Sequence, residues 1–418
     1  MRFLILTQYF PPEIGGAPTR LYSLATELIR LGHEVEVVTA LPNYPRGVFF
    51  PGYEDCFYRR ETQDALVIHR VWMYPNSRGS AVQRMMGYGS FALTSLYGLQ
   101  RAKRPDHIFI ESPPLFVGFP GFLAGRIWKA SVVFNVADLW PDALLELGLL
   151  KKGWVAQTLG VLERWCYQRA AFVNSMTEGI HSALLNQKSL PPRKVIFLPH
   201  GVDTVLFQPR PADTALAERL GLQGKKIVLW AGTLGHAHGL SHVLQAAKLL
   251  QNRTEIHFLF VGDGTDRKPL EQQKREMNLQ NVTFHDPVPI EQLPPFFSIS
   301  MCGLASLRDI PAFEGARPSK VFPVFASGKP LVFAGKGEMP RLLAESQAGV
   351  SVPPENPEAL AQAILYLASN PQLADELGKN GRRYVETHLQ WSKLIEEWIA
   401  RLNSPTQPEI LDPVMSRT

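Results

Sequence analysis

This 418-residue chain contains two regions in which short apolar runs alternate with segments of helical periodicity. In the first half, an apolar run at 3–6 precedes leucines at helical spacing over 18–31, a glycine stop at Gly32 and another apolar run at 35–39. This order predicts a βαβ unit with parallel strands and a right-handed crossover. Further buried strands are expected at 65–71, 107–110, 131–136, 172–174 and 195–198.

The same alternation restarts after residue 224. Strands are expected at 226–230, 256–261, 282–284, 303–305 and 330–334, and helices at 240–250, 267–277, 290–297 and 318–328. Two such runs predict an α/β fold, with two doubly wound Rossmann-like domains facing a cleft. The expected limits are 1–205 for the first domain, 206–224 for a linker, 225–385 for the second domain, 386–402 for a terminal helix packing back on the first domain, and 403–418 for a loose tail.

Composition excludes several classes of protein. The hydrophobic fraction of 45% and the charged fraction of 19% are typical of globular domains. Cys56, Cys166 and Cys302 are odd in number and far apart, which argues against a disulfide framework or zinc site and favours a reducing compartment. The net charge of +5 is too mild to indicate nucleic-acid binding. The apolar start is too short for a signal peptide, so the expected location is cytoplasmic.

Glycine pairs follow three expected strands. Gly15 and Gly16 follow the first strand, Gly232 and Thr233 lie in the loop after 226–230, and Gly262 follows 256–261. Glycines after a strand and before a helix allow the backbone to approach an anion closely, although simple turns explain each pair equally well. His236 and His238 offer imidazoles, but no third ligand is evident nearby, so no metal site is expected.

The segment 317–334 predicts a helix start at Pro318 and Ser319, a stop at Gly328 and a buried strand after Pro330. A helix N-terminus offers unpaired N–H groups, and Lys320 would add a cation in the first turn. The segment therefore predicts either a diphosphate site or an ordinary helix-to-strand connection with a solvated lysine.

Together these motifs resemble the GT-B retaining glycosyltransferases of family 4, in the form found in bacterial surface-polysaccharide enzymes. The resemblance covers nearly the whole chain and is carried by PPEIGG (11–16), DLWP (138–141), PHGVD (199–203), AGTLG (231–235), VGDG (261–264) and PSK (318–320) running on to ASGKP (326–330).

The resemblance implies sugar transfer with retention and without a metal or other cofactor. The substrates would be a nucleotide-diphosphate sugar, expected to be a UDP-linked HexNAc, and a glycan or polyprenyl-linked acceptor. The donor would lie on the second domain and the acceptor on the first. The donor-binding residues implied are Gly15, Gly16, Gly232, Thr233, His236, Gly262, His285, Val288, Glu314, Ser319 and Lys320.

On the acceptor side, Asp138 is expected to orient or deprotonate the acceptor hydroxyl, or else to cap the turn at 140–141. Glu111, at the end of the strand expected over 107–110, is a second candidate for catalysis. No protein nucleophile is assigned.

The sequence departs from the family pattern beside Lys320. Pro323 stands where the family has a glutamate that accepts hydrogen bonds from the donor ribose, and a proline past the first turn would also weaken a helix. Glu314 stands one residue from the position of the family's other glutamate, Met301 replaces an expected aspartate, and His236 replaces a basic residue. These departures leave two interpretations: an active enzyme that holds the ribose by its backbone or another side chain, or a non-catalytic subunit of a polysaccharide assembly complex. A nucleotide-sugar epimerase, which belongs to an enzyme class with the same fold, is a further alternative.

Peripheral membrane contact is a further open alternative. The apolar segment 85–99 is flanked by basic residues and suits either docking on an anionic bilayer or burial as a core helix. The flanking residues are Arg78, Arg84, Arg101, Lys103 and Arg104.

Overall fold

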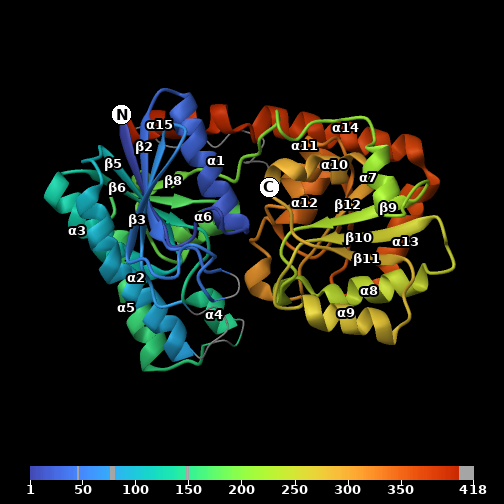
Figure 1. The fold of residues 1–418 in the computed structure, drawn as a ribbon, viewed down its shortest axis with the longest axis horizontal. Helices are drawn as coiled ribbons and strands as arrows, with labels where there is room; N and C mark the ends of the chain where they lie inside the picture. Colours follow the sequence, from blue (N-terminus) through green and yellow to red (C-terminus); the bar gives the residue numbers. More distant parts are fainter. Residues whose placement is uncertain (45–46, 76–80, 147, 149, 404–418) are drawn as a thin grey trace. The chain divides into compact units, whose positions relative to one another are not determined.

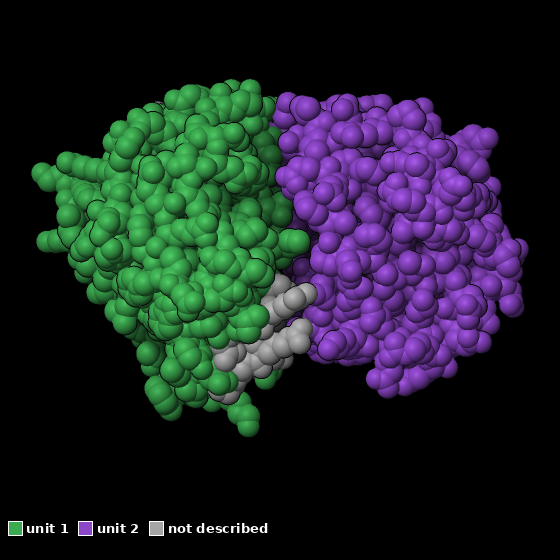
Figure 2. Space-filling view, in the orientation of Figure 1, with its two compact units in different colours: residues 1–200, 391–418 green, residues 201–390 purple. Residues whose placement is uncertain are grey.

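The computed structural model describes residues 1–44, 47–75, 81–146, 148 and 150–403. Two compact units divide the chain, and Figures 1 and 2 show both. Unit 1 comprises residues 1–200 together with the chain from 391 onward, and unit 2 comprises residues 201–390. The chain therefore leaves unit 1, builds unit 2 and returns to unit 1 for its last helix.

Unit 1 is built on an eight-stranded sheet of order β3-β4-β2-β1-β5-β6-β7-β8, in which β3 alone pairs antiparallel. Helices on both faces make it doubly wound (Figure 1). Its elements are β1 (Arg2–Leu6), α1 (Gly16–Arg30), β2 (Glu34–Ala40), β3 (Tyr58–Gln63), β4 (Leu66–Val71), α2 (Ala81–Arg101), β5 (His107–Ser112), η1 (Leu115–Val117), α3 (Gly118–Trp128), β6 (Ser131–Val136), α4 (Asp142–Glu146), α5 (Trp154–Arg169), β7 (Phe172–Ser175), α6 (Glu178–Asn186), η2 (Pro192–Lys194), β8 (Val195–Phe197) and α15 (Trp391–Asn403).

Unit 2 has a six-stranded, fully parallel sheet of order β11-β10-β9-β12-β13-β14. Its elements are α7 (Thr214–Arg219), β9 (Lys226–Ala231), η3 (His236–His238), α8 (Leu240–Leu249), β10 (Ile256–Val261), α9 (Arg267–Glu276), β11 (Val282–His285), η4 (Ile290–Gln292), α10 (Pro294–Ser298), β12 (Ser300–Ser306), η5 (Pro311–Phe313), α11 (Val321–Ala326), β13 (Leu331–Ala334), α12 (Glu338–Ser346), β14 (Gly349–Val352), α13 (Pro357–Ser369) and α14 (Pro371–His388). The expectation of two Rossmann-like domains is confirmed.

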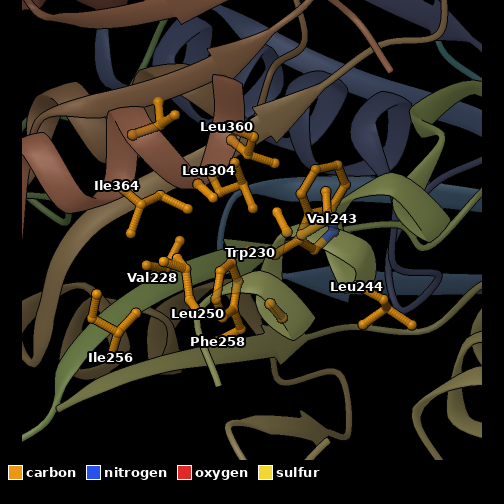
Figure 3. Packing of buried hydrophobic residues seen from close by; sticks show 14 of the residues in the cluster. Val228, Trp230, Val243, Leu244, Leu250, Ile256, Phe258, Leu304, Leu360 and Ile364 are labelled. Carbon is orange, nitrogen blue, oxygen red and sulfur yellow. The ribbon is translucent and has the colours of Figure 1, made fainter. Parts of the chain in front are cut away.

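The core of unit 2 lies where β9, β10 and β12 meet α8 and α13. Figure 3 shows side chains from the strands, such as Trp230 and Phe258, packed against Leu244 of α8 and Ile364 of α13. The central strands are largely apolar, because helices cover both faces of a parallel sheet.

Several elements differ from the sequence-based expectations. The range 206–224 was predicted to be a linker, but it belongs to unit 2 and contains α7. Two edge strands, β3 and β14, were not predicted, because their side chains are largely exposed or half-buried and lack an apolar run. Most of the tail predicted over 403–418, and Arg78, lie outside the described residues.

The helix α11 also differs from its prediction. It spans six residues, with Lys320 as the residue that precedes its first turn, rather than the eleven positions of 318–328. Pro323 is then the third helical residue, where the backbone N–H would have no partner within the helix. The predicted cost of this proline to helix stability is therefore wrong, because the helix begins later than the sequence pattern indicated.

Helix α15 completes one face of the unit 1 sheet. Trp398 is 2% exposed and packs against Phe3 and Phe109, with ring centroids 6.1 and 5.8 Å away. Its indole N–H donates to the Oδ1 of Asn174, 3.2 Å away in β7. No helix among the described residues has both the length and the apolar character that crossing a membrane requires.

Replacing Trp398 with alanine is expected to destabilise unit 1 by about 4 kcal/mol, because it opens a cavity in a close-packed core. The measurement is urea unfolding followed by circular dichroism. Trp154→Ala serves as the control, since Trp154 is 77% exposed, and should change stability by less than about 0.5 kcal/mol. Equal effects of the two substitutions would contradict a structural role for α15.

Candidate functional site

The candidate residues of unit 2 gather where the strand order reverses. The sheet runs outward from β9 through β10 in one direction and from β12 through β13 in the other. In such sheets ligands bind beyond the carboxyl ends of the strands at this switch point. The loop after β9 carries Gly232 and Thr233, and the segment after β12 carries Arg308. This placement follows from topology alone.

Two glycines let the strand ends approach each other closely. Gly262 has φ +152°, and a Cβ added there would lie 2.0 Å from the carbonyl oxygen of Gly232. Gly232 itself has φ +139° and lies beside the Lys320 side chain, whose Cε would be 3.4 Å from an added Cβ. Glycine is required at Gly262 because a side chain would overlap backbone that cannot move without separating β9 from β10.

Lys320 is the central cation of this cluster. Its Nζ lies 3.1 Å from Nε2 of His238 and 3.7 Å from the ring centroid of Trp230. No carboxylate among the described residues forms an ion pair with it. Burial lowers the pKa of Lys320 well below its ordinary value, although the side chain as a whole is half-buried. An anion bound here would supply the missing counter-charge.

His238 is held in one tautomer by its neighbours. Its Nδ1 lies 3.0 Å from the carbonyl oxygen of Ser306, so Nδ1 must carry the proton and Nε2 must accept from Lys320. Burial, followed by the charge of Lys320, lowers the pKa of His238 to about 3. The imidazole therefore stays neutral and orients Lys320.

Arg308 is a site residue that the sequence analysis missed. Its Nη1 lies 2.5 Å from Nε2 of His236, and its Nε donates to Glu355 across 3.2 Å. The sequence signal was available, because Arg308 follows the apolar run of β12 directly. The family resemblance places a basic residue in the β9 loop, where this chain has His236, and so does not point to Arg308.

The loop after β11 lies beside the loop after β10, at the same edge of the unit 2 sheet. The backbone N–H of Gly262 donates to the carbonyl of His285, 3.2 Å away, and Nδ1 of His285 donates to the carbonyl of Asp286. Arg267 contacts both Asp286 and the Gly262 carbonyl, at 2.8 and 3.0 Å. His285 and Gly262 are thus adjacent to the β9 loop, and Val288 follows them half-buried.

Glu314 and Ser319 lie before α11. Glu314 is exposed, and its carbonyl accepts from the N–H of Glu338, 2.7 Å away, which fixes the loop to the start of α12. Ser319 is half-buried in the turn before Lys320. Because α11 has only six residues, its dipole is small, and the anion-binding argument rests on Lys320 and the glycine loops rather than on a helix N-terminus.

The remaining candidates belong to unit 1. Gly15 precedes α1 with extended backbone, and Gly16 begins that helix and is exposed. The loop is braced by the buried carboxylate of Glu13, which accepts from the backbone N–H groups of Asn43, Tyr44 and Phe10 at 2.9, 2.8 and 3.2 Å. Burial raises the pKa of Glu13 to about 7 despite these three bonds.

Glu111 lies in a buried polar network. Its Oε1 is 2.5 Å from Arg20, its Oε2 accepts from Asn135 at 2.8 Å, and Asn135 in turn accepts from Asn174, the partner of Trp398. Both carboxylate oxygens are therefore engaged. These contacts favour a positioning role for Glu111 over proton transfer.

Asp138 follows β6 and is exposed. Desolvation by surrounding protein atoms and, second, the charge of Glu111 raise its pKa to about 6, while Arg20 acts in the opposite direction. The side chain remains accessible, so the shift reflects crowding around the carboxylate rather than complete burial. None of the described residues donates a hydrogen bond to this carboxylate, which argues against the capping alternative.

Comparisons with known proteins agree with this geometry. The family model for a glycosyl transferase 4-like domain matches residues 15–201, and that for glycosyl transferases group 1 matches residues 213–384. A putative colanic acid biosynthesis glycosyl transferase, WcaI from Escherichia coli, is 30% identical over 96% of this chain and 99% of its own length. The probable glycosyltransferase WbjE from Pseudomonas aeruginosa is 26% identical over 63% of this chain and 66% of its own length.

Solved structures share the fold. A sucrose-phosphate synthase from Thermosynechococcus elongatus superposes with a TM-score of 0.74 at 18% identity, covering 96% of this chain and 99% of its own. Anabaena HepE, solved with UDP and glucose, superposes with a TM-score of 0.73 at 18% identity, covering 97% of this chain and all of its own.

Gly262→Ala is expected to lower the stability of unit 2 by about 3 kcal/mol, because the new methyl group would overlap the Gly232 carbonyl and strain the backbone. Chemical unfolding measures this change. Gly235→Ala is the matched control: Gly235 has φ −125° and an added Cβ would make only an ordinary contact, 3.6 Å from Thr233. If Gly262→Ala were as stable as this control, the close approach of the two strand ends would be refuted.

Proposed function

Because the chain belongs to the group 1 glycosyltransferases, with a glycosyl transferase 4-like first half, we propose that this enzyme transfers a sugar from a nucleotide-diphosphate donor during polysaccharide biosynthesis. The acceptor is a glycan or a polyprenyl-linked saccharide. The observation that carries the proposal is Lys320, a cation without a counter-ion among the described residues, placed at the switch point of the unit 2 sheet. The polysaccharide context is supported by the name of one relative, the putative colanic acid biosynthesis glycosyl transferase WcaI.

The donor diphosphate lies against the β9 loop. Lys320 and Arg308 provide positive charge on the two sides of this loop, and the backbone N–H of Thr233 donates a hydrogen bond to the diphosphate. The N–H of Gly232 is already engaged, because it donates to the carbonyl of Val261, 2.9 Å away. As the sugar leaves, negative charge develops on the diphosphate, and fixed cations in a partly buried site stabilise it. Two protein cations take the place that a divalent ion holds in other transferases, so we propose a metal-independent reaction without another cofactor.

The donor nucleotide is proposed to be a uridine nucleotide. HepE, with the same fold, was solved with UDP and with UDP-glucose, which supports a uridine nucleotide. The base is proposed to lie near His285 and Val288, and the sugar near Glu314. A UDP-linked HexNAc remains the proposed donor, transferred with retention.

On the acceptor side, Asp138 orients or deprotonates the attacking hydroxyl. Its raised pKa suits a base that works near neutral pH. Glu111, fixed by Arg20 and Asn135, holds its negative charge close to Asp138 and contributes to that pKa.

Pro323 gives a specific reason to test whether transfer occurs at all. A proline cannot accept a hydrogen bond from a ribose hydroxyl through its side chain, so the ribose must be held by another group. Incubation with a panel of UDP-, GDP- and ADP-sugars, followed by mass spectrometry and NMR of the products, tests the proposal. An epimerised free nucleotide sugar would identify the epimerase alternative, and binding without any product would identify the non-catalytic subunit.

Binding of UDP is expected to take up a proton at Lys320 when the pH lies between the pKa of this group in the free protein and its pKa in the complex. The free protein holds the Lys320 pKa low, the bound diphosphate raises it, and between the two pKa values binding requires protonation. Affinity should therefore fall as pH rises through this window. Isothermal titration in buffers of different ionisation enthalpy measures the uptake.

In Lys320→Met the proton uptake should vanish and the affinity should fall at least roughly tenfold, since a charge-assisted contact is lost. Lys336→Met is the control, because Lys336 is exposed and paired with Asp309 at 2.8 Å. Unchanged proton uptake in Lys320→Met would show that Lys320 does not contact the bound phosphate.

Asp138→Asn is expected to lower kcat by roughly 100-fold or more, the usual range for loss of a general base. In the unsubstituted enzyme kcat/KM should rise with pH through about 6, as Asp138 ionises, and the variant should lose this limb. A remaining limb near pH 7 would report Glu13, whose pKa is about 7. The control is Asp64→Asn in an exposed turn; full activity in Asp138→Asn would disprove the assignment.

A further inference from the structure

One face of unit 1 exposes apolar side chains in a regular pattern. Helix α3 presents Phe119, Leu123 and Ile127 at intervals of four residues, with exposed fractions of 52, 39 and 67%. Residues four apart lie on one side of a helix. Arg126 is the one polar side chain that α3 exposes between them. The outward side of this helix is therefore almost entirely apolar, the reverse of an ordinary surface helix.

The two helices beside it extend this surface. Helix α2 packs against α3, and α5 packs against the short η1 helix that leads into α3 (Figure 1). Helix α2 exposes Val82, Met86 and Leu93, which share one side of that helix, and α5 exposes Trp154 and Val161. We name the outward surface of these three helices the α2–α3–α5 face.

Charge on these three helices and the residues that flank them is almost entirely positive. Residues 81–105, 113–130 and 151–170 carry ten lysines and arginines and one acid, whereas the whole chain carries 43 basic and 38 acidic residues. The acid, Glu163, is buried and paired with Lys188 at 2.8 Å. Several of the cations form no ion pair with any described residue: Arg126, Lys129, Lys151, Lys152 and Arg164.

We propose that the α2–α3–α5 face docks on the surface of an anionic lipid bilayer. Exposed aromatic and aliphatic side chains would enter the boundary between headgroups and acyl chains, and the surrounding cations would contact lipid phosphates. A second copy of this chain fits the face poorly, because a two-fold interface would place this cationic layer against itself. The docking rests on unit 1 alone and stands independently of the donor site.

The sequence analysis found only part of this surface. It singled out the segment 85–99, which lies in α2, and the basic residues that flank this segment in the sequence. The stripe on α3 was hidden within an apolar segment with three glycines, which carries no helical periodicity of its own. Packing shows which of its residues face outward, and the pattern then becomes visible.

Flotation of the full-length protein with vesicles tests the proposal. Vesicles of phosphatidylcholine with one quarter phosphatidylglycerol should bind the protein at low salt, and pure phosphatidylcholine vesicles should bind it at least roughly tenfold more weakly. Raising the salt to 0.5 M should weaken the first interaction. Absence of flotation at low salt, or equal binding to both vesicles, would overturn the proposal.

Two pairs of variants locate the contact. Leu123→Gln with Ile127→Gln should weaken vesicle binding roughly tenfold or more. Leu249→Gln with Tyr366→Gln should leave it unchanged, because these residues are similarly exposed in unit 2.

A second pair of double variants removes positive charge instead of apolar side chains. Arg126→Gln with Arg164→Gln should weaken binding to anionic vesicles roughly tenfold, whereas Arg253→Gln with Arg275→Gln, exposed in unit 2, should not. Equal losses in the test and control variants would overturn the proposal.

Thermal unfolding and UDP affinity should stay at the values of the unsubstituted protein in all four double variants, which separates lost docking from lost folding or lost donor binding. Sedimentation analysis completes the test. A dimer that dissociates on Leu123→Gln with Ile127→Gln would show that the face joins two copies of the chain, and would overturn lipid docking.

Discussion

Parallel strands end at one edge of a sheet, and every candidate group in this protein depends on that constraint. In unit 2 the close approach of Gly262 to Gly232 brings the ends of β9 and β10 together, and the reversal of strand order brings Arg308 beside the same loop. Lys320 then enters from the segment before α11. Three segments that are separate in sequence thus meet at one place, and two of them each contribute one cation. The sequence itself contains no run of basic residues at either position.

Buried polar contacts serve orientation more than stability in both units. His238 is kept neutral by burial and directs Lys320, and Arg20 with Asn135 fixes both oxygens of Glu111. Such groups cost desolvation energy that ion pairs recover only partly. Their contribution lies in fixing the direction of Lys320 and of Glu111.

The fold was largely predictable from the sequence, and the site only in part. Strands buried on both faces, such as β1, β6 and β10, appear as continuous apolar runs, whereas the edge strands β3 and β14 do not. The glycine loops and Lys320 were found through local patterns and a family resemblance. Arg308, the tautomer of His238 and the engagement of Glu111 depend on residues distant in sequence, which no local pattern reveals. The start of α11 was misjudged because Pro318 resembles a helix start equally well.

The return of α15 to unit 1 has a consequence for biosynthesis. A ribosome releases the chain from its first residue, so all strands of unit 1 emerge before unit 2 is made. Yet Ile395 and Trp398, which cover Phe3 and Phe109, are made only after residues 201–390 of unit 2. During translation that face of the sheet stays uncovered until the residues after unit 2 are made, and such transiently exposed apolar surface is prone to aggregation.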